Sequence, residues 1–260
     1  MGFYKNSGKR GVKIPKASEI IARRIRNDIV THVLKEGQLL PPEVKLMEEF
    51  GVSRPTIREA YRILESDRLV SVTRGAKGGA VIHSPDPDLI VEQMLMVLGW
   101  EGSKISDLYE ARAITEPELV KVLTLKGSKE APDVLREILE RIRLLIKNTE
   151  DYAEVLTEFH MQLVSLAGNH IMRHMAEVMN RVMAYHKTLV LNRIKREDGE
   201  STFYAQAEMG LKSYKKLIDL IEKGEADAAE NHWRKHIKNA NEIWLNQFDM
   251  SIEELYLELQ

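Results

Sequence analysis

The sequence predicts a mainly α-helical fold in two parts: a front part of short helices with one β-hairpin, and a rear part that is an all-α antiparallel helical bundle. Apolar residues recur at a spacing of three and four through most of the 260 residues. Strand-like composition with clustered glycines is confined to residues 69–83. A proline-containing stretch, residues 84–88, then separates the two parts.

The two parts carry opposite charge. Residues 1–83 hold 16 Lys and Arg against 9 Asp and Glu, whereas residues 84–260 hold 22 against 31. A basic front and an acidic rear favour a nucleic-acid reader joined to a partner-binding module. Absence of cysteine excludes disulfide and thiol chemistry and is compatible with a cytoplasmic location, which we expect. The longest apolar run, Met94–Trp100, is too short to span a bilayer, so we expect no membrane association.

The first segment, residues 1–16, is polar and basic and is predicted to be a flexible arm. A helix is expected from about Ser18 to Lys35, and Gly37 should end it. Residues 38–40 could then supply a short first strand. The apolar stripe of the helix has a spacing of four: Ile21, Ile25, Ile29 and Val33.

Two short helices joined by a tight turn are predicted within residues 43–66. Gly51 ends the first helix, Ser53 is a suitable N-cap for the second, and Pro55 is tolerated in a first turn. The second helix has an apolar stripe and, on another side, arginines at a spacing of four. The stripe is Ile57, Ala60, Tyr61 and Leu64, and the arginines are Arg54, Arg58 and Arg62. This pattern is typical of a helix-turn-helix.

The arginines of this second helix suit the major groove of DNA. A guanidinium can bond guanine O6 and N7 in a fork, so we expect Arg54 and Arg58 to read bases. Thr56 could contact a thymine methyl group or a phosphate, and Lys45 a phosphate. The alternative is that these are solvated side chains on an exposed helix.

A β-hairpin is predicted after the two helices. Residues 69–73 and 80–83 have strand composition, and glycines fill the stretch between them. A phosphate-cradling nucleotide loop would need a following helix and a Lys-Ser or Lys-Thr pair, which the stretch lacks. We therefore expect a wing whose tip residues, Arg74 and Gly75, approach the minor groove or the backbone of DNA. Residues 17–83 would form a winged helix-turn-helix domain.

Residues 84–88 are the expected linker, and residues 89–260 read as helices only. Pro117 should kink or split the second of these helices. Ser251 and Glu254 have the spacing of a capping box for the last helix. The predicted spans are 86–99, 105–125, 130–148, 151–167, 169–195, 202–222, 225–247 and 251–258.

The front part resembles the winged helix-turn-helix of GntR-type bacterial regulators. The matching motifs are Leu40-Pro41-Pro42-Glu43, the run from Gly51 to Ala60, Leu64-Glu65, and the glycine-rich run from Arg74 to Val81. The resemblance implies DNA-reading roles for Arg54, Thr56 and Arg58, and a homodimer on a near-palindromic double-stranded operator. Regulators of the FadR branch often carry Arg directly after the motif glutamate, where this chain has Val44.

The rear part resembles the helical ligand-binding domain of the FadR branch, called FCD. The markers are Asp107–Arg112 with Glu116-Pro117, Phe159-His160 with Leu166–Asn169, and Leu220–Glu225 with His236. The resemblance implies that residues 89–260 bind an effector and form the dimer. Many such domains hold a divalent metal with one Asp and three His. Here His160 and His236 match, while Leu156 and Tyr214 occupy the other two positions.

We therefore expect an organic effector held directly, with no cofactor. Arg112 is the expected anchor for a carboxylate or phosphate group, and His160, Tyr214 and His236 are expected to line the cavity. Two alternatives stay open. Arg112 and Glu116, four residues apart, could form a surface ion pair, and His160 with His236 could hold a zinc ion.

The predicted function is a sequence-specific transcriptional regulator. We expect a repressor that leaves its operator when a small organic effector, a carboxylate or an acyl-CoA-like molecule, binds the helical domain. One alternative is a metal-dependent sensor that uses His160 and His236. Another is a metal-assisted enzyme with an accessory DNA-binding part. The sequence shows no recognisable nucleophile–base arrangement, so we do not expect an enzyme.

Overall fold

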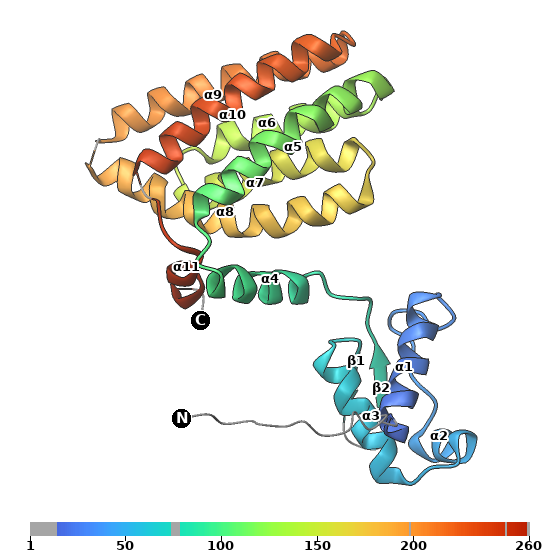
Figure 1. Cartoon of the computed structure of the whole chain (residues 1–260). Helices are drawn as coiled ribbons and strands as arrows, with labels where there is room; N and C mark the ends of the chain where they lie inside the picture. Colours follow the sequence, from blue (N-terminus) through green and yellow to red (C-terminus); the bar gives the residue numbers. More distant parts are fainter. Residues whose placement is uncertain (1–14, 74–78, 198, 248, 259–260) are drawn as a thin grey trace, which may run out of the picture. The chain divides into compact units, whose positions relative to one another are not determined.

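The computed structural model describes residues 15–73, 79–197, 199–247 and 249–258 (Figure 1). The chain divides between Leu89 and Ile90 into two compact units. The first unit contains the helix-turn-helix, and the named elements in the described residues of the second are all helices. The predicted fold class is confirmed. Within the described ranges, no helix has the length and apolar character needed to cross a membrane.

The first unit packs three helices against a two-stranded antiparallel sheet. In β1 and β2, Val70 lies opposite Ile82 and Thr73 opposite Gly79. The predicted first strand is reduced to a single bridge between Leu39 and Val81 beside β2. The elements are α1 (Ala17–Val30), α2 (Glu43–Phe50), α3 (Arg54–Ser66), β1 (Val70–Thr73) and β2 (Gly79–Ile82).

Helix α1 ends at Val30, so the predicted end at Lys35 was wrong. Thr31 caps the helix, and His32 adopts a left-handed backbone conformation with φ of 59°. The following chain must turn back to the sheet, where the Gly37 N–H donates to the Ile82 carbonyl at 2.9 Å. Val33 is consequently exposed and does not extend the apolar stripe of the helix.

The turn between α2 and α3 follows the sequence in most respects. Gly51 has φ of 63°, a left-handed conformation that glycine adopts without steric cost. All four residues of the predicted apolar stripe of α3 are buried. Ser53 stands at the N-cap position but makes no capping bond, because its Oγ lies 3.0 Å from Thr56 Oγ1.

The second unit is a bundle of long helices, and all eight predicted helices are present. Pro117 lies inside α5, which runs unbroken, so the predicted split was wrong, while the predicted kink stays a prediction. The elements are α4 (Asp88–Trp100), α5 (Ile105–Lys126), α6 (Ala131–Leu145), α7 (Thr149–Leu166), α8 (His170–Glu197), α9 (Gly199–Glu222), α10 (Ala226–Gln247) and α11 (Ile252–Glu258). Helices α5 and α10 lie side by side, as do α7 and α8 (Figure 1).

Two apolar clusters hold the second unit together. The larger is built from α5 to α10 around residues such as Phe159 and Trp233. The smaller joins α4 and α11 to the start of α5 and the middle of α8, with Tyr109 and Met183 at its centre. Helix α8 contributes to both clusters, so it links the two parts of the bundle.

The end of the described chain folds back onto the loop before α5. The Ile105 N–H donates to the Met250 carbonyl at 3.0 Å, and the Ile252 N–H donates to the Ser103 carbonyl at 2.9 Å. The predicted capping box is present: the Ser251 N–H donates to Glu254 Oε2 at 2.8 Å, and the Glu254 N–H donates to Ser251 Oγ at 3.1 Å.

Replacing Ile57 by Ala is expected to destabilise the first unit by about 3 kcal/mol, because a fully buried side chain leaves a cavity in the core. Ile20→Ala is the matched control, since Ile20 is 46% exposed; its cost should stay below about 1 kcal/mol. Hydrogen–deuterium exchange of the amides in α1 and α3 measures both. Equal losses of protection would contradict the burial of Ile57 in the core and the exposure of Ile20.

Candidate DNA-reading surface and effector cavity

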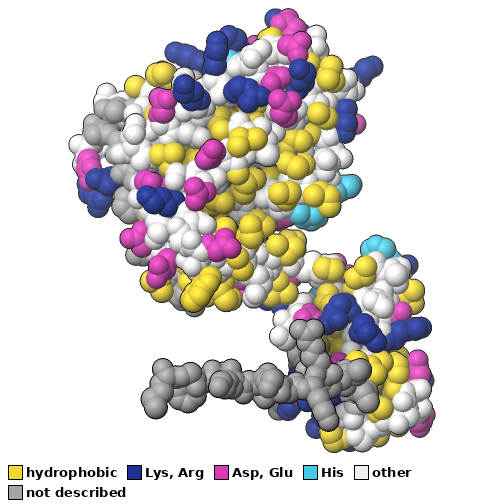
Figure 2. Space-filling model, viewed as in Figure 1, with side chains coloured by type: hydrophobic (Ala, Val, Ile, Leu, Met, Phe, Trp, Pro, Cys, Tyr) yellow, Lys and Arg dark blue, Asp and Glu magenta, His cyan; other side chains and the backbone are white. Residues whose placement is uncertain are grey.

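The exposed face of α3 carries the predicted base readers. Arg54 and Arg58 are exposed, while the apolar stripe of the same helix packs into the core. The amphipathic pattern of α3 therefore fixes which side of the helix the guanidinium groups occupy. Figure 2 shows Lys and Arg side chains on the visible face of this unit.

Glu43 contacts both arginines that are predicted to read bases. Its Oε2 lies 3.3 Å from Arg54 Nε, and its Oε1 lies 3.3 Å from Arg58 Nε. Both contacts join a carboxylate oxygen of Glu43 to an arginine Nε. Glu43 was not among the predicted site residues. Its position as the first residue of α2, after two prolines and facing an arginine-rich helix, is the signal that could have identified it.

The other predicted DNA-contacting residues are placed as follows. Lys45 is exposed on α2, and Thr56 is partly buried in the first turn of α3. Arg74 and Gly75 lie outside the described residues, so their roles stay predictions. The strands on either side of them pair as far as Thr73 and Gly79, as the hairpin prediction requires.

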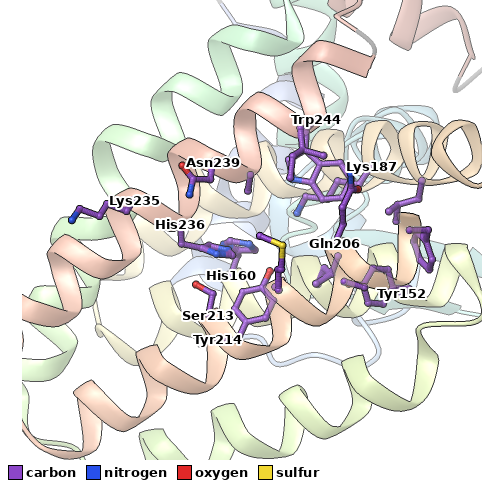
Figure 3. A pocket seen from close by; sticks show the side chains of 18 of the residues that line it. Tyr152, His160, Lys187, Gln206, Ser213, Tyr214, Lys235, His236, Asn239 and Trp244 are labelled. Carbon is purple, nitrogen blue, oxygen red and sulfur yellow. The ribbon is translucent and has the colours of Figure 1, made fainter. Parts of the chain in front are cut away.

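The second unit contains a cavity of about 360 Å³ between α7, α8, α9 and α10 (Figure 3). Its wall mixes aromatic and aliphatic side chains with a few polar groups, which is the usual composition of a small-molecule site. The lining residues come from α7 (Tyr152, Leu156, His160), α8 (Lys187, Leu191), α9 (Phe203, Gln206, Ala207, Met209, Gly210, Ser213, Tyr214) and α10 (His232, Lys235, His236, Asn239, Ala240, Ile243, Trp244).

Three of the four predicted effector residues line this cavity: His160, Tyr214 and His236. The fourth, Arg112, does not. Arg112 is buried on α5, where its Nη2 donates to Asn241 Oδ1 at 2.9 Å and its guanidinium lies 5.1 Å from the centre of the Tyr109 ring. Its Nε and Nη1 are buried without a hydrogen-bond partner among the described residues. Arg112 is therefore not part of the described wall of the cavity.

Glu116 organises the interior beside the cavity. Its Oε1 accepts hydrogen bonds from His160 Nδ1 at 2.6 Å and from Trp233 Nε1 at 2.8 Å. Arg112 and Glu116 are both 2% exposed, so the alternative of a surface ion pair was wrong. The Trp233 indole stacks on the His236 ring, with centroids 4.4 Å apart and planes 13° apart.

Burial sets the protonation of the two cavity histidines. It lowers the pKa of His160 to about 4, against the opposing effect of Glu116. Burial also holds the pKa of His236 well below its usual value of 6.5. Burial would raise the pKa of Glu116, but His160, Arg112 and the Trp233 hydrogen bond outweigh it and lower that pKa. At neutral pH both imidazoles are therefore neutral beside an ionised carboxylate.

The two histidines of the metal alternative, His160 and His236, both line the cavity. Leu156 and Tyr214, which stand where many FCD domains have the other two ligands, line it as well. His160 Nδ1 is engaged by Glu116, which leaves Nε2 as the acceptor nitrogen of this ring. In the part of the chain that the structure describes, no three His, Cys, Asp or Glu side chains are grouped so as to hold a metal ion.

Lys187 is a cavity residue that was missed from the sequence. It is 1% exposed, and its Nζ lies 3.4 Å from Thr157 Oγ1. Burial lowers the pKa of Lys187 well below its usual value. The sequence contains a signal for its burial, because Lys187 continues a stripe of α8 at a spacing of three and four whose members are buried. The other members of that stripe are Ala176, Asn180, Met183, Val190, Leu191 and Ile194.

A helix-turn-helix that displays arginines, joined in one chain to a helical bundle with a cavity, defines a ligand-responsive DNA-binding regulator. Comparison with known families agrees. Residues 17–80 match the model of bacterial regulatory proteins of the gntR family, and residues 107–239 match the FCD domain. The chain belongs to the GntR family of regulators, in the group that carries an FCD domain, an architecture consistent with the FadR subfamily.

Individual relatives cover most of the chain at low identity. The HTH-type transcriptional repressor NanR of Cronobacter sakazakii is 24% identical over 91% of this chain and 88% of its own length. The Uxu operon regulator of Haemophilus influenzae is 26% identical over 84% of this chain and 78% of its own length. The solved structure of Streptococcus agalactiae GntR shares the fold, with a TM-score of 0.65, 22% identity, and coverage of 86% of this chain and 98% of that one.

Glu43→Gln is expected to reduce sequence discrimination. Loss of the carboxylate charge frees both arginines from their ion pairs, so fewer guanidiniums are preorganised for guanine. It also removes one negative charge facing DNA, so affinity for random DNA should rise. Fluorescence anisotropy with operator and random duplexes measures the ratio of the two affinities. Glu48→Gln, at an exposed position of α2, should keep that ratio; a similar fall there would contradict the role of Glu43.

The protein is expected to lose stability as the pH falls from 7 to 5. His160 has a pKa near 4 when folded against about 6.5 when unfolded, so the unfolded chain takes up the proton first and is favoured between these values. This difference amounts to about 2 kcal/mol at pH 5. Chemical denaturation at pH 7 and pH 5 measures it. His160→Gln should reduce the slope, and an unchanged slope would contradict the assignment.

Proposed function

We propose that this protein is a repressor that binds a near-palindromic operator as a homodimer and leaves it when a small organic carboxylate fills the cavity. The observation that carries this proposal is the cavity itself, with a buried lysine, two neutral histidines and aromatic walls on a chain that also displays a DNA-reading helix. The names of the two relatives, a transcriptional repressor and an operon regulator, support it. The cytoplasm, where operators lie, is the proposed location.

Exposed apolar side chains support self-association. On α4, Ile90 and Val97 are exposed, and Trp100 is 92% exposed. Large apolar patches on one face commonly mark a surface that binds a partner. Figure 2 shows apolar side chains gathered on the visible face of the helical unit. We propose that a second copy of the chain covers such a face and presents a second DNA-reading helix to the other operator half.

The size of the cavity favours the carboxylate over the acyl-CoA-like molecule. A volume of about 360 Å³ is near the lower end of the range for small-molecule sites, roughly 300–1,000 Å³. A complete acyl-CoA joins a nucleotide, a pantetheine arm and an acyl chain, which together exceed this volume. A compact organic acid is the ligand class that we propose.

We propose that the protein acts by binding and not by turnover. The cavity does contain one serine–histidine contact, with His232 Nε2 at 3.2 Å from Ser213 Oγ. The same Nε2 lies 2.9 Å from the Ser213 carbonyl oxygen, so it donates its proton there and does not serve as a base for the hydroxyl. The relatives support this proposal, since they are transcriptional regulators.

Binding of the protein to DNA upstream of its own gene tests the proposed function. Footprinting should show a discrete symmetric site, and titration with organic acids should release it. Arg58→Ala should cost about 1–3 kcal/mol on that site and relax base preference there. Lys45→Ala should weaken specific and random DNA alike, as expected for a phosphate contact. Equal losses on both DNAs for Arg58→Ala would contradict base reading, and a footprint unaffected by any acid would contradict release.

A further inference from the structure

We propose that Lys187 binds the charged group of the effector, and that this group is a single carboxylate. The inference rests on the proposed function, because it names the ligand class and the anchor of the same cavity. It replaces the anchor expected from the sequence, Arg112, which lies outside the described wall of the cavity.

Lys187 has hydrogen-bonding capacity that the protein leaves unused. An ammonium group carries three N–H donors. The contact to Thr157 Oγ1, at 3.4 Å, is long, and the Thr157 hydroxyl itself donates to the Ala153 carbonyl at 2.9 Å. Among the described residues, no carboxylate forms an ion pair with Lys187. A buried ammonium without an ion-pair partner destabilises the folded protein, and a bound anionic ligand would reduce that cost.

The balance of buried charge indicates the charge of the ligand. Among the described residues, the buried side chains with a formal charge are Arg112, Glu116 and Lys187. Burial disfavours the ammonium form of Lys187. A ligand with one negative charge beside Nζ would favour that form, and the buried group of two cations and two anions would then be neutral. Lys235 also borders the cavity but is exposed, where water screens its charge. A dianion such as phosphate would instead leave an uncompensated charge in the interior.

The side chains near Lys187 indicate which chemical groups the rest of the ligand carries. In Figure 3 Lys187 lies beside Trp244 and Gln206, on the side of the view away from Lys235. Trp244, Phe203 and Leu191 provide apolar and aromatic wall for a carbon skeleton. Gln206, Ser213 and Asn239 add neutral polar side chains that can bond hydroxyl or carbonyl groups. The ligand class is a compact monocarboxylic acid with an apolar face and a few neutral polar groups.

Thermal unfolding of the full-length protein with matched acid and amide probes tests this assignment. The pairs are 3-phenylpropionate with 3-phenylpropionamide, and gluconate with gluconamide; inorganic phosphate and zinc chloride complete the set. At least one acid should raise the Tm by several degrees while its amide does not, because only the acid carries the charge. Lys187→Met should abolish that rise, and Lys212→Met, at an exposed position of α9 outside the cavity wall, should keep it.

The Tm of ligand-free Lys187→Met separates binding from a structural role. Methionine fills a similar volume without a charge, so the ligand-free variant should be at least as stable as the wild type. A lower Tm, or an acid-induced rise that survives in Lys187→Met, would overturn the assignment. So would stabilisation by phosphate or zinc alone, or no rise with either acid.

Failure of this inference and failure of the proposed function are distinguishable. If an acid stabilises the wild type through Lys187 but leaves operator binding unchanged, the anchor stands and release from DNA is wrong. If an acid releases the operator equally from the wild type and from Lys187→Met, the proposed function stands and the anchor is wrong.

Discussion

The burial of one carboxylate constrains the helical unit. Glu116 lies in an apolar interior, where an ionised group without partners would be very costly. His160 and Trp233 each donate to it, and Arg112 lies one turn away on the same helix. These partners come from α5, α7 and α10, so a single charge fixes the relative positions of three helices. The wall of the cavity is built on that arrangement, with His160 in the wall and Trp233 stacked behind His236.

A similar use of one carboxylate is found in the DNA-binding unit, at the protein surface. Glu43 at the start of α2 contacts the guanidiniums of Arg54 and Arg58 on α3. There the ion pairs are solvated and contribute little to stability. Their effect is to limit the conformations of two long side chains before DNA arrives. A carboxylate thus organises a buried cluster in one unit and a pair of exposed arginines in the other.

The sequence predicted elements well where local spacing decides the outcome. The stripe from Ile57 to Leu64 and the eight helices of the bundle depend on apolar periodicity and on glycine or capping residues at their ends. Sequence-based prediction failed where contacts with residues distant in the chain determine the structure. Helix α1 stops early because the chain must reach β2, and the side chains that face the cavity depend on how α7 to α10 pack. Arg112 and Lys187 are both buried basic residues, and only that packing places the lysine in the wall.

The fold-back of the last described segment has a consequence for shortened or tagged forms of the chain. Residues 250 and 252 supply backbone hydrogen bonds on both sides of the loop that precedes α5, and α11 provides Leu255 to the same small cluster as Val91 and Leu95 of α4. Deleting α11 would expose apolar side chains of α4, the helix that directly follows the linker, although about 150 residues of sequence separate the two helices. A fusion partner placed directly after α11 would therefore act on the packing of α4.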